Sequence, residues 1–139
     1  MSRLIATIHN IESVENLNIV TFICNDIILK MMSLDLNDTV QIGKRVVLGC
    51  KPTSVALAKT GMGQQAFSEM LSDANQIEVK ISSMDVGTLL SSIKLDFQGF
   101  VLEAIITTAS LKRMKLNEKD EVLALIKANE LSIQEVLDD

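Results

Sequence analysis

The sequence predicts a mostly β protein made of two small β-barrels in tandem, and two observations support this prediction. The first is an internal repeat: segments 46–55 and 122–131 both contain an apolar stretch that ends in a lysine, Lys51 or Lys127, and leads into a polar turn. Self-similarity of this kind decides the architecture before local propensity does. The second is a series of short apolar segments at even spacing with few helical patterns, which is typical of small barrels.

The repeat extends through most of each half. Three pairs align the halves: segment 2–8 with segment 75–81, Ser33 with Ser110, and Lys51 with Lys127. These pairs are 73, 77 and 76 residues apart (75 − 2, 110 − 33, 127 − 51). Such small changes in spacing are expected between strands, where insertions are tolerated. The predicted organisation is a first unit at 1–58, a linker with a short helix at 59–74, and a second unit at 75–139.

Strands of the first unit are predicted from the alternation of apolar and polar residues. They cover residues 3–11, 17–24, 27–32, 45–50 and, as the last strand of the unit, 54–58. The pair Asn25-Asp26 is a tight-turn sequence, so the second and third of these strands should form a hairpin. Residues 33–37 are predicted to form a helical turn.

The linker and the second unit follow the same plan. In the segment 64–71 the residues Phe67, Met70 and Leu71 lie at i, i+3 and i+4, which predicts a short amphipathic helix. Strands of the second unit are predicted at 76–84, 89–97, 100–106 and 121–127, and a strand at 131–136 is expected to close the unit. Gln98-Gly99 should form a hairpin turn, and residues 110–114 one helical turn.

Composition limits the possible functions. Hydrophobic residues make up 47% of the chain but Phe is the only aromatic type, so an aliphatic core is expected. No apolar run approaches the roughly 18 residues of a membrane span, and the start of the chain does not resemble a signal peptide. The net charge of −5 argues against a nucleic-acid surface. Units of about 60 residues are marginally stable alone, so each is expected to bury surface against a neighbour.

Few residues suit catalysis or metal binding. His9 is the only histidine, and it lies in a predicted strand without a nucleophile pattern near it. Cys24 and Cys50 form no Cys-x-x-Cys motif and are expected to be reduced, buried thiols of a cytoplasmic protein. The Gly61-x-Gly63 pattern predicts a flexible joint rather than a phosphate loop. We therefore expect a binding protein, with no enzyme activity and no direct metal site.

Four segments of the second half occur in the order typical of a Mop domain, the molybdate-binding module of the molbindin and TOBE group. They are Ser-Asp-Ala-Asn at 72–75, Ile-Thr-Thr-Ala-Ser at 106–110, Lys-Asp-Glu-Val at 119–122 and Leu-Ile-Lys-Ala at 125–128. The first half keeps two similar segments, 42–46 and 51–55. The tandem therefore resembles the di-Mop molbindins and also the C-terminal half of molybdate-responsive transcription regulators.

This resemblance implies a fold and a function. The fold is a tandem of OB-like barrels, and in this group strands are exchanged across the interface where the anion binds, between subunits or repeats. The implied ligand is molybdate or tungstate, with no organic cofactor, in a homo-oligomer that is a trimer or a dimer. The implied role is intracellular molybdenum storage or homeostasis, without nucleic-acid or membrane binding. The alternative is a regulatory or dimerisation module for a molybdate-responsive transcription regulator or transporter.

The residues that match the family motifs form the expected oxyanion site. Thr107 and Ser110 would present hydroxyl groups at the start of a helical turn, where free backbone N–H groups favour an anion. Lys127 would supply positive charge, and Ser72 and Asn75 would close the site. These residues also have a simpler interpretation, in which Thr107 caps a helix, Ser110 is a surface hydroxyl and Lys127 is a solvated charge.

Several positions depart from the family pattern. The arginine of the motif is replaced by Ala74, which removes one charge-assisted donor and should weaken binding. In the alignment of the first unit, Lys30 takes the place of Thr107, while Ser33 and Lys51 keep the places of Ser110 and Lys127. Arg3 could reach this site, although it aligns with Gln76. The first-unit site is thus predicted either to be rebuilt around these residues or to be structural only.

Overall fold

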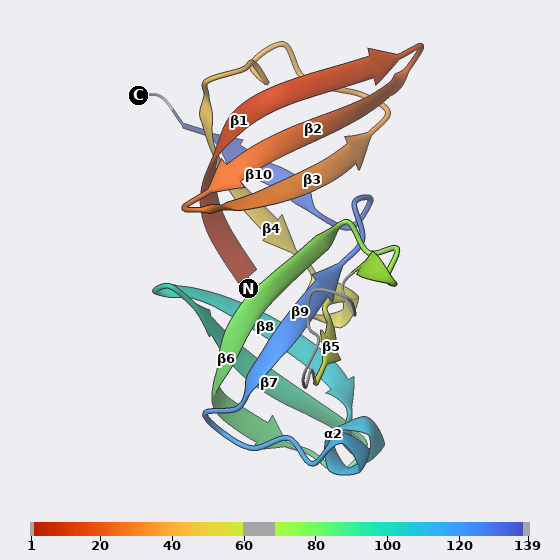
Figure 1. The fold of residues 1–139 in the computed structure, drawn as a ribbon, viewed down its shortest axis with the longest axis vertical. Coiled ribbons are helices and arrows are strands. Elements are labelled where there is room, and N and C mark those ends of the chain that lie inside the picture. The colour runs from red at the N-terminus through yellow and green to blue at the C-terminus, as the bar shows by residue number, and fades with distance from the viewer. Residues whose placement is uncertain (1, 60–68, 138–139) are drawn as a thin grey trace.

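The computed structural model describes residues 2–59 and 69–137, and these form two curled antiparallel sheets of five strands each (Figure 1). The first half contains β1 (Ser2–Val14), β2 (Leu17–Cys24), β3 (Ile27–Ser33), β4 (Arg45–Cys50), the 3-10 helix η1 (Pro52–Ser54) and β5 (Ala56–Ala58). The second half contains β6 (Asn75–Val86), β7 (Leu90–Phe97), β8 (Phe100–Thr107), α2 (Thr108–Met114), β9 (Glu121–Ile126) and β10 (Ser132–Val136). The predicted mostly β tandem is confirmed.

Two predicted helical segments have different outcomes. The helix expected at 64–71 falls mostly on residues outside the described ranges. The helical turn expected at 33–37 is wrong, because this segment leaves β3 as a loop. The Ser33 hydroxyl donates a hydrogen bond to the carbonyl of Asp35, over 2.7 Å. Local bonds of this kind compete with helical ones, which explains the loop.

The last strand of each half belongs to the sheet of the other half. The strand orders are β10-β4-β1-β2-β3 and β5-β9-β6-β7-β8, and Figure 1 shows β10, in blue, among the strands of the first unit. β5 pairs with β9, and β10 pairs with β4. The expectation that each of these strands closes its own unit is therefore wrong. Exchange covers the open edges of β4 and β9, which would otherwise present unpaired backbone groups.

Strand registers repeat between the two sheets. Ile8 lies opposite Phe22 in the first, and Ile81 lies opposite Leu95 in the second. An irregularity in the register directly follows both Ile8 and Ile81. The backbone bonds around them also repeat, since Ile8 N–H donates to the carbonyl of Lys44 and Ile81 N–H to that of Asp120, both over 2.9 Å. The two units are copies of one structural plan.

This register corrects one part of the sequence alignment. In the hairpins, Cys24 lies opposite Ile27 and Phe97 opposite Phe100, so equivalent residues of β3 and β8 are 73 positions apart (100 − 27). The alignment of Ser33 with Ser110 at 77 positions is therefore wrong. The equivalents of Lys30 and Ser33 are Glu103 and Ile106 (103 − 30, 106 − 33). Ser110 belongs to α2, for which the first unit has only a loop.

The cores of both units are aliphatic, as predicted. Inward positions of the strands alternate with outward ones, which is the pattern of a sheet with one buried face. Side chains that are at most 2% exposed include Leu4, Ile8, Phe22 and Leu48 in the first unit, and Ile77, Ile81, Leu95 and Ile126 in the second. Burial of this apolar surface is the main stabilising contribution to each barrel.

Hydrogen bonds join the two units at the edge of β3. Asn75, at the start of β6, is completely buried, and its Oδ1 accepts from the backbone N–H of Lys30 over 2.6 Å. Its Nδ2 donates to the Lys30 carbonyl over 2.9 Å. Two residues further on, the N–H of Met32 donates to the carbonyl of Ala128 over 2.9 Å. The Asn75 amide thus pairs with the backbone of the edge strand β3. Residues at the start of β6 and just after β9 therefore both bind β3.

The turns of the two equivalent hairpins also meet. The Nδ2 of Asn25 donates to Oε1 of Gln98 over 2.8 Å, and Nε2 of Gln98 donates to Oδ1 of Asp26 over 3.3 Å. Asn25 and Gln98 occupy the same place in their hairpins, so a pseudo-twofold axis passes near this contact. Both residues adopt positive φ angles, 55° and 50°, in the tight turns that the sequence predicts.

We predict that Asn75→Ala destabilises the protein by about 2–3 kcal/mol, because it leaves the Lys30 backbone groups without partners at a buried contact. Chemical denaturation followed by circular dichroism measures this change. Asn10→Ala, at an exposed position of β1, is the control and should change stability by less than about 0.5 kcal/mol. Equal stability of the two variants would show that the amide does not hold the units together.

Candidate functional site

Two lysines approach the same junction between the units. Lys30 lies on β3, with an exposed side chain, and its backbone is bonded to Asn75. Lys127 directly follows β9 and is also exposed. The next residue, Ala128, accepts the hydrogen bond from Met32, so the turn that carries Lys127 lies against β3. We call this place the lysine junction, and it contains Lys30, Met32, Asn75, Lys127 and Ala128.

Other predicted residues lie near the lysine junction in the chain. Ser33 follows Met32 and ends β3, but its hydroxyl is bonded to the Asp35 carbonyl. Ser72 is exposed, three residues before Asn75. Asn75 itself has no exposed surface, so in this structure its amide positions the Lys30 backbone rather than facing solvent. The structure therefore brings together Lys30, Asn75 and the Lys127 turn.

Thr107 and Ser110 lie elsewhere. Thr107 is the N-cap of α2, and Figure 1 shows α2 at the end of the second unit that is farther from the first. Thr107 Oγ1 accepts from the backbone N–H of Ser110 over 3.1 Å and donates to Ser110 Oγ over 2.8 Å. Arg113 also donates to Ser110 Oγ, over 3.3 Å. The Thr107 hydroxyl thus caps the helix, as in the simpler interpretation of this residue.

The pseudo-symmetric junction has a different charge. Lys51 precedes η1, which packs against β8. The β8 residue equivalent to Lys30 is Glu103, a half-buried side chain that accepts a hydrogen bond from Ser92 Oγ. Lys51 also lines a cavity of about 500 Å³. Glu130, which precedes the exchanged strand β10, lines the same cavity. Carboxylates disfavour an oxyanion through charge repulsion.

Arg3 lies apart from Lys51 along the sheet. It is an exposed residue of β1, opposite Gly49 of β4. Gly49 also lies opposite Ser132 of the exchanged strand β10. Arg3 therefore belongs to the outer surface of the first sheet.

Comparisons with known proteins place this fold. A scan against protein families matches residues 71–133 to the TOBE domain. A molybdate-binding protein from Sporomusa ovata is 35% identical over 49% of this chain and 97% of that chain, with a TM-score of 0.43. The second half of the chain therefore matches the TOBE domain. A search of curated proteins finds no match.

The likeness to a second solved structure covers both units. This structure is the cytoplasmic molybdate-binding protein ModG with molybdate bound, which is 18% identical to this chain with a TM-score of 0.83. The match includes 94% of this chain and 93% of that chain. The chain therefore has the fold of a TOBE tandem, and the predicted OB-like barrels are confirmed.

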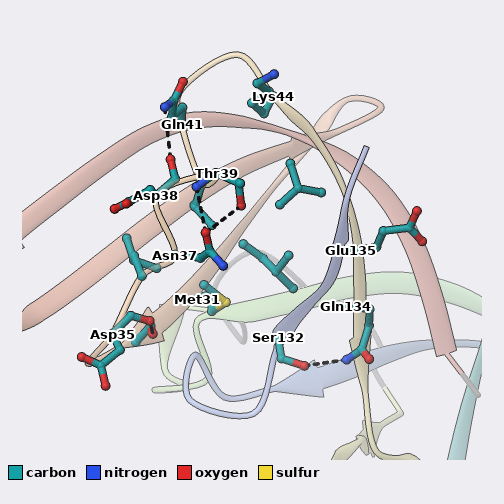
Figure 2. Close-up of a pocket in the computed structure, with 15 residues that line it drawn as sticks. Met31, Asp35, Asn37, Asp38, Thr39, Gln41, Lys44, Ser132, Gln134 and Glu135 are labelled. Atoms are coloured by element: carbon teal, nitrogen blue, oxygen red, sulfur yellow. Dashed lines mark hydrogen bonds between the residues drawn. The ribbon is translucent and has the colours of Figure 1, made fainter. Parts of the chain in front are cut away.

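The first TOBE-like unit has a cavity of about 760 Å³ between the end of β3, the loop 35–44 and β10 (Figure 2). Apolar lining residues are Met31, Leu36, Val40, Ile133 and Val136. Asp35, Asp38 and Glu135 are exposed at its border, where Lys44 is the only lysine or arginine among the described residues that line the cavity. Three carboxylates make it unsuitable for a dianion. This cavity could not be predicted from the sequence, because it depends on the exchanged strand β10.

Cys24 and Cys50 are buried and form no disulfide, as expected. The Sγ of Cys24 donates to the carbonyl of Ile5 over 3.3 Å, and burial raises the pKa of the Cys24 thiol. His9 is exposed on β1, where the strand register is irregular. Within the described residues, no group of three or more His, Cys, Asp or Glu side chains could hold a metal ion. No described helix is long and apolar enough to cross a membrane.

We predict that both thiols react slowly with Ellman's reagent in the folded protein. Burial restricts access, and the raised pKa of Cys24 lowers its thiolate fraction at any given pH below that of a free cysteine. At pH 8 the reaction should be at least about 100-fold slower than in denaturant, where both thiols should react. Rapid modification of one thiol in the native protein would contradict the described burial.

We predict that Thr107→Ala lowers stability by about 1 kcal/mol, because the first turn of α2 loses its cap. Thr107→Ser keeps an oxygen at the same place and should retain most of the stability. Denaturant titrations in anion-free buffer measure both variants. If Thr107→Ala were as stable as the parent chain, the hydroxyl would not act as a cap.

Proposed function

We propose that this chain binds molybdate reversibly at the lysine junction, without catalysing a reaction. The observation that carries the proposal is that the turn of Lys127, from the second unit, lies against the edge of β3, the strand that carries Lys30, through the hydrogen bond from Met32 N–H to the Ala128 carbonyl. The TOBE match and the fold of molybdate-bound ModG support the choice of ligand. Tungstate has the same charge and nearly the same size, so we expect it to compete.

The chemistry of the junction suits a tetrahedral dianion. Each lysine ammonium group offers three hydrogen-bond donors and one positive charge. Bonds between ionised partners are roughly twice as strong as neutral ones. Both side chains are exposed in the structure, so they are free to turn towards an anion while Asn75 keeps the backbone of Lys30 in place. A local pair of positive charges also attracts anions to a chain with a net charge of −5.

The two junctions should differ in affinity. Glu103 occupies the place of Lys30 at the pseudo-symmetric junction, and a carboxylate there repels a dianion. We therefore expect one strong site per chain rather than two. Reversible binding of this kind fits molybdenum storage or homeostasis inside the cell, by a homo-oligomer that needs no organic cofactor.

A second candidate function is a regulatory module that joins a molybdate-responsive regulator or transporter. The hydroxyls of Thr107 and Ser110, which match the family motif, are bonded to each other in the helix cap. This observation favours a chain in which part of the ligand set has become structural. Affinity purification of the full chain from its own cells would separate the candidates, since a regulatory module should bring a stable partner and a storage protein should not.

Isothermal titration with molybdate tests the proposed binding. Lys127→Ala and Lys30→Ala should each raise the dissociation constant about 10-fold or more, because each removes a charge-assisted bond worth about 1.5–3 kcal/mol. Lys80→Ala, at an exposed position of β6, is the matched control and should leave the dissociation constant unchanged. Tungstate should give similar heats, and sulfate should give weaker ones.

Two outcomes would count against molybdate binding at this place. No saturable heat with millimolar molybdate or tungstate would reject the ligand class. Tight binding that is equally strong in the Lys30, Lys127 and Lys80 variants would keep the ligand but reject the lysine junction.

A further inference from the structure

The cavity beside β10 in the first unit has an apolar floor and a charged border (Figure 2). Its volume of about 760 Å³ is within the range of about 300–1,000 Å³ that is common for small-molecule sites. Met31 of β3 is 5% exposed, and Leu36 and Val40 of the loop 35–44 are half-buried. No residue of the lysine junction is among the described residues that line this cavity, so a ligand here is independent of the proposed anion site.

The exchanged strand β10 supplies the other wall of the cavity. Its register against β4 is irregular between Ile133 and Glu135. An extra residue at such an irregularity changes which side chains share one face of the strand. Ile133 and Val136 accordingly pack against the core and line the cavity, whereas Glu135 is exposed at the border. This wall therefore presents apolar side chains inward and a carboxylate at its edge.

The second unit shows that the fold can fill the corresponding space. Between β8 and β9 the chain forms α2, and Leu111 in this helix and Leu116 just after it are 7% and 3% exposed. Lys59, which follows the exchanged strand β5, donates to two backbone carbonyls at the C-terminal end of α2, both over 3.1 Å. In the first unit, the apolar lining residues of the loop 35–44 are only half-buried. Apolar surface in the first unit therefore remains available to a ligand.

Charge at the border of the cavity selects the ligand. Asp35 and Asp38 lie on the loop side and Glu135 on the opposite side (Figure 2), and all three are exposed. Because Lys44 is the only lysine or arginine among the described lining residues, the border has a formal charge of −2 (1 − 3). Such a border attracts a cation and repels an anion. Within the described residues, no group of three or more His, Cys, Asp or Glu side chains could hold a metal ion, so these carboxylates do not form a metal site.

We propose that this cavity binds a small organic amine, in which an apolar body carries an ammonium group. The body lies on Met31, Val40 and Ile133, where binding removes apolar surface from water. The ammonium group lies at the border, where it donates hydrogen bonds to a carboxylate. The cavity and the lysine junction thus select ligands of opposite charge.

Two fluorescent probes that differ in charge test this proposal. Dansylcadaverine has an apolar ring system and an ammonium group, and dansyl-aminohexanoic acid has the same rings and a carboxylate. Titration of the full chain with dansylcadaverine should give a saturable rise in fluorescence, and the acid should bind at least about 10-fold more weakly. Val40→Trp places a larger side chain in the cavity, so it should raise the dissociation constant of dansylcadaverine at least about 10-fold.

Variants of the border test the charge selection. Asp35→Asn/Asp38→Asn keeps the shape of both side chains and should raise the dissociation constant of dansylcadaverine about 5-fold, as expected for two exposed charges. Glu12→Gln/Asp85→Asn, at exposed positions of β1 and β6, is the matched control, since it changes the net charge equally and should leave the dissociation constant unchanged. Lys44→Gln removes the positive charge at the border and should strengthen binding. Circular dichroism melting curves should confirm that all variants are folded.

Four results would overturn the proposal. The first is the lack of a saturable change with millimolar dansylcadaverine, and the second is equal binding of the two probes. The third is equal affinity of the Asp35→Asn/Asp38→Asn variant and its control. A folded Val40→Trp variant that binds the amine as tightly as the parent chain is the fourth, because the probe then lies outside this cavity.

Discussion

Reciprocal pairing of β5 with β9 and of β10 with β4 is the interaction on which the rest of the structure depends. Each unit has too few residues to bury a large core, and without the exchange each sheet would keep an open edge. The exchange also sets the path of the chain. After Lys51 and after Lys127, the chain has to cross to the other sheet, so each lysine turn lies at the boundary between units. The lysine junction is a consequence of this crossing rather than a separate feature.

The two units have diverged on the same framework. The second has α2 after β8, a charged outer face and Glu103 in the middle of β8. The first has a loop and a cavity in place of the helix, an apolar outer face and Lys30 at the equivalent position. Since the strand registers are repeated, the differences in charge reflect side chains, whereas α2 is a local addition to the chain path. The proposed anion site therefore lies at only one of the two junctions.

Most of the fold could be predicted from the sequence, because strand signals are local. The alternation of apolar and polar residues located β2 and β4 at their observed bounds, and Gln98-Gly99 located a hairpin turn. The exchange of β5 and β10 could not be derived from pattern alone, because a short apolar strand pairs equally well with either sheet. Only the family resemblance implied it.

The candidate site was less predictable, because it depends on register and on contacts between distant segments. Lys127 was found from its motif, but its meeting with Lys30 follows from the bond between Met32 and Ala128, which no local pattern encodes. The alignment placed Ser33 opposite Ser110 because both are serines. In the second unit the α2 segment adds residues after β8, and this changes the spacing between equivalent positions of the two units. Asn75 was selected as a ligand, and the structure shows an amide that pairs with the backbone of β3.

A crystal structure of the protein grown with molybdate, with anomalous scattering measured at the molybdenum edge, is the most direct test of anion binding at the lysine junction. We expect one strong anomalous peak per chain, within hydrogen-bonding distance of the ammonium groups of Lys30 and Lys127, and none beside Glu103. A well-ordered crystal with molybdate at the start of α2, or with no bound molybdate, would contradict this assignment.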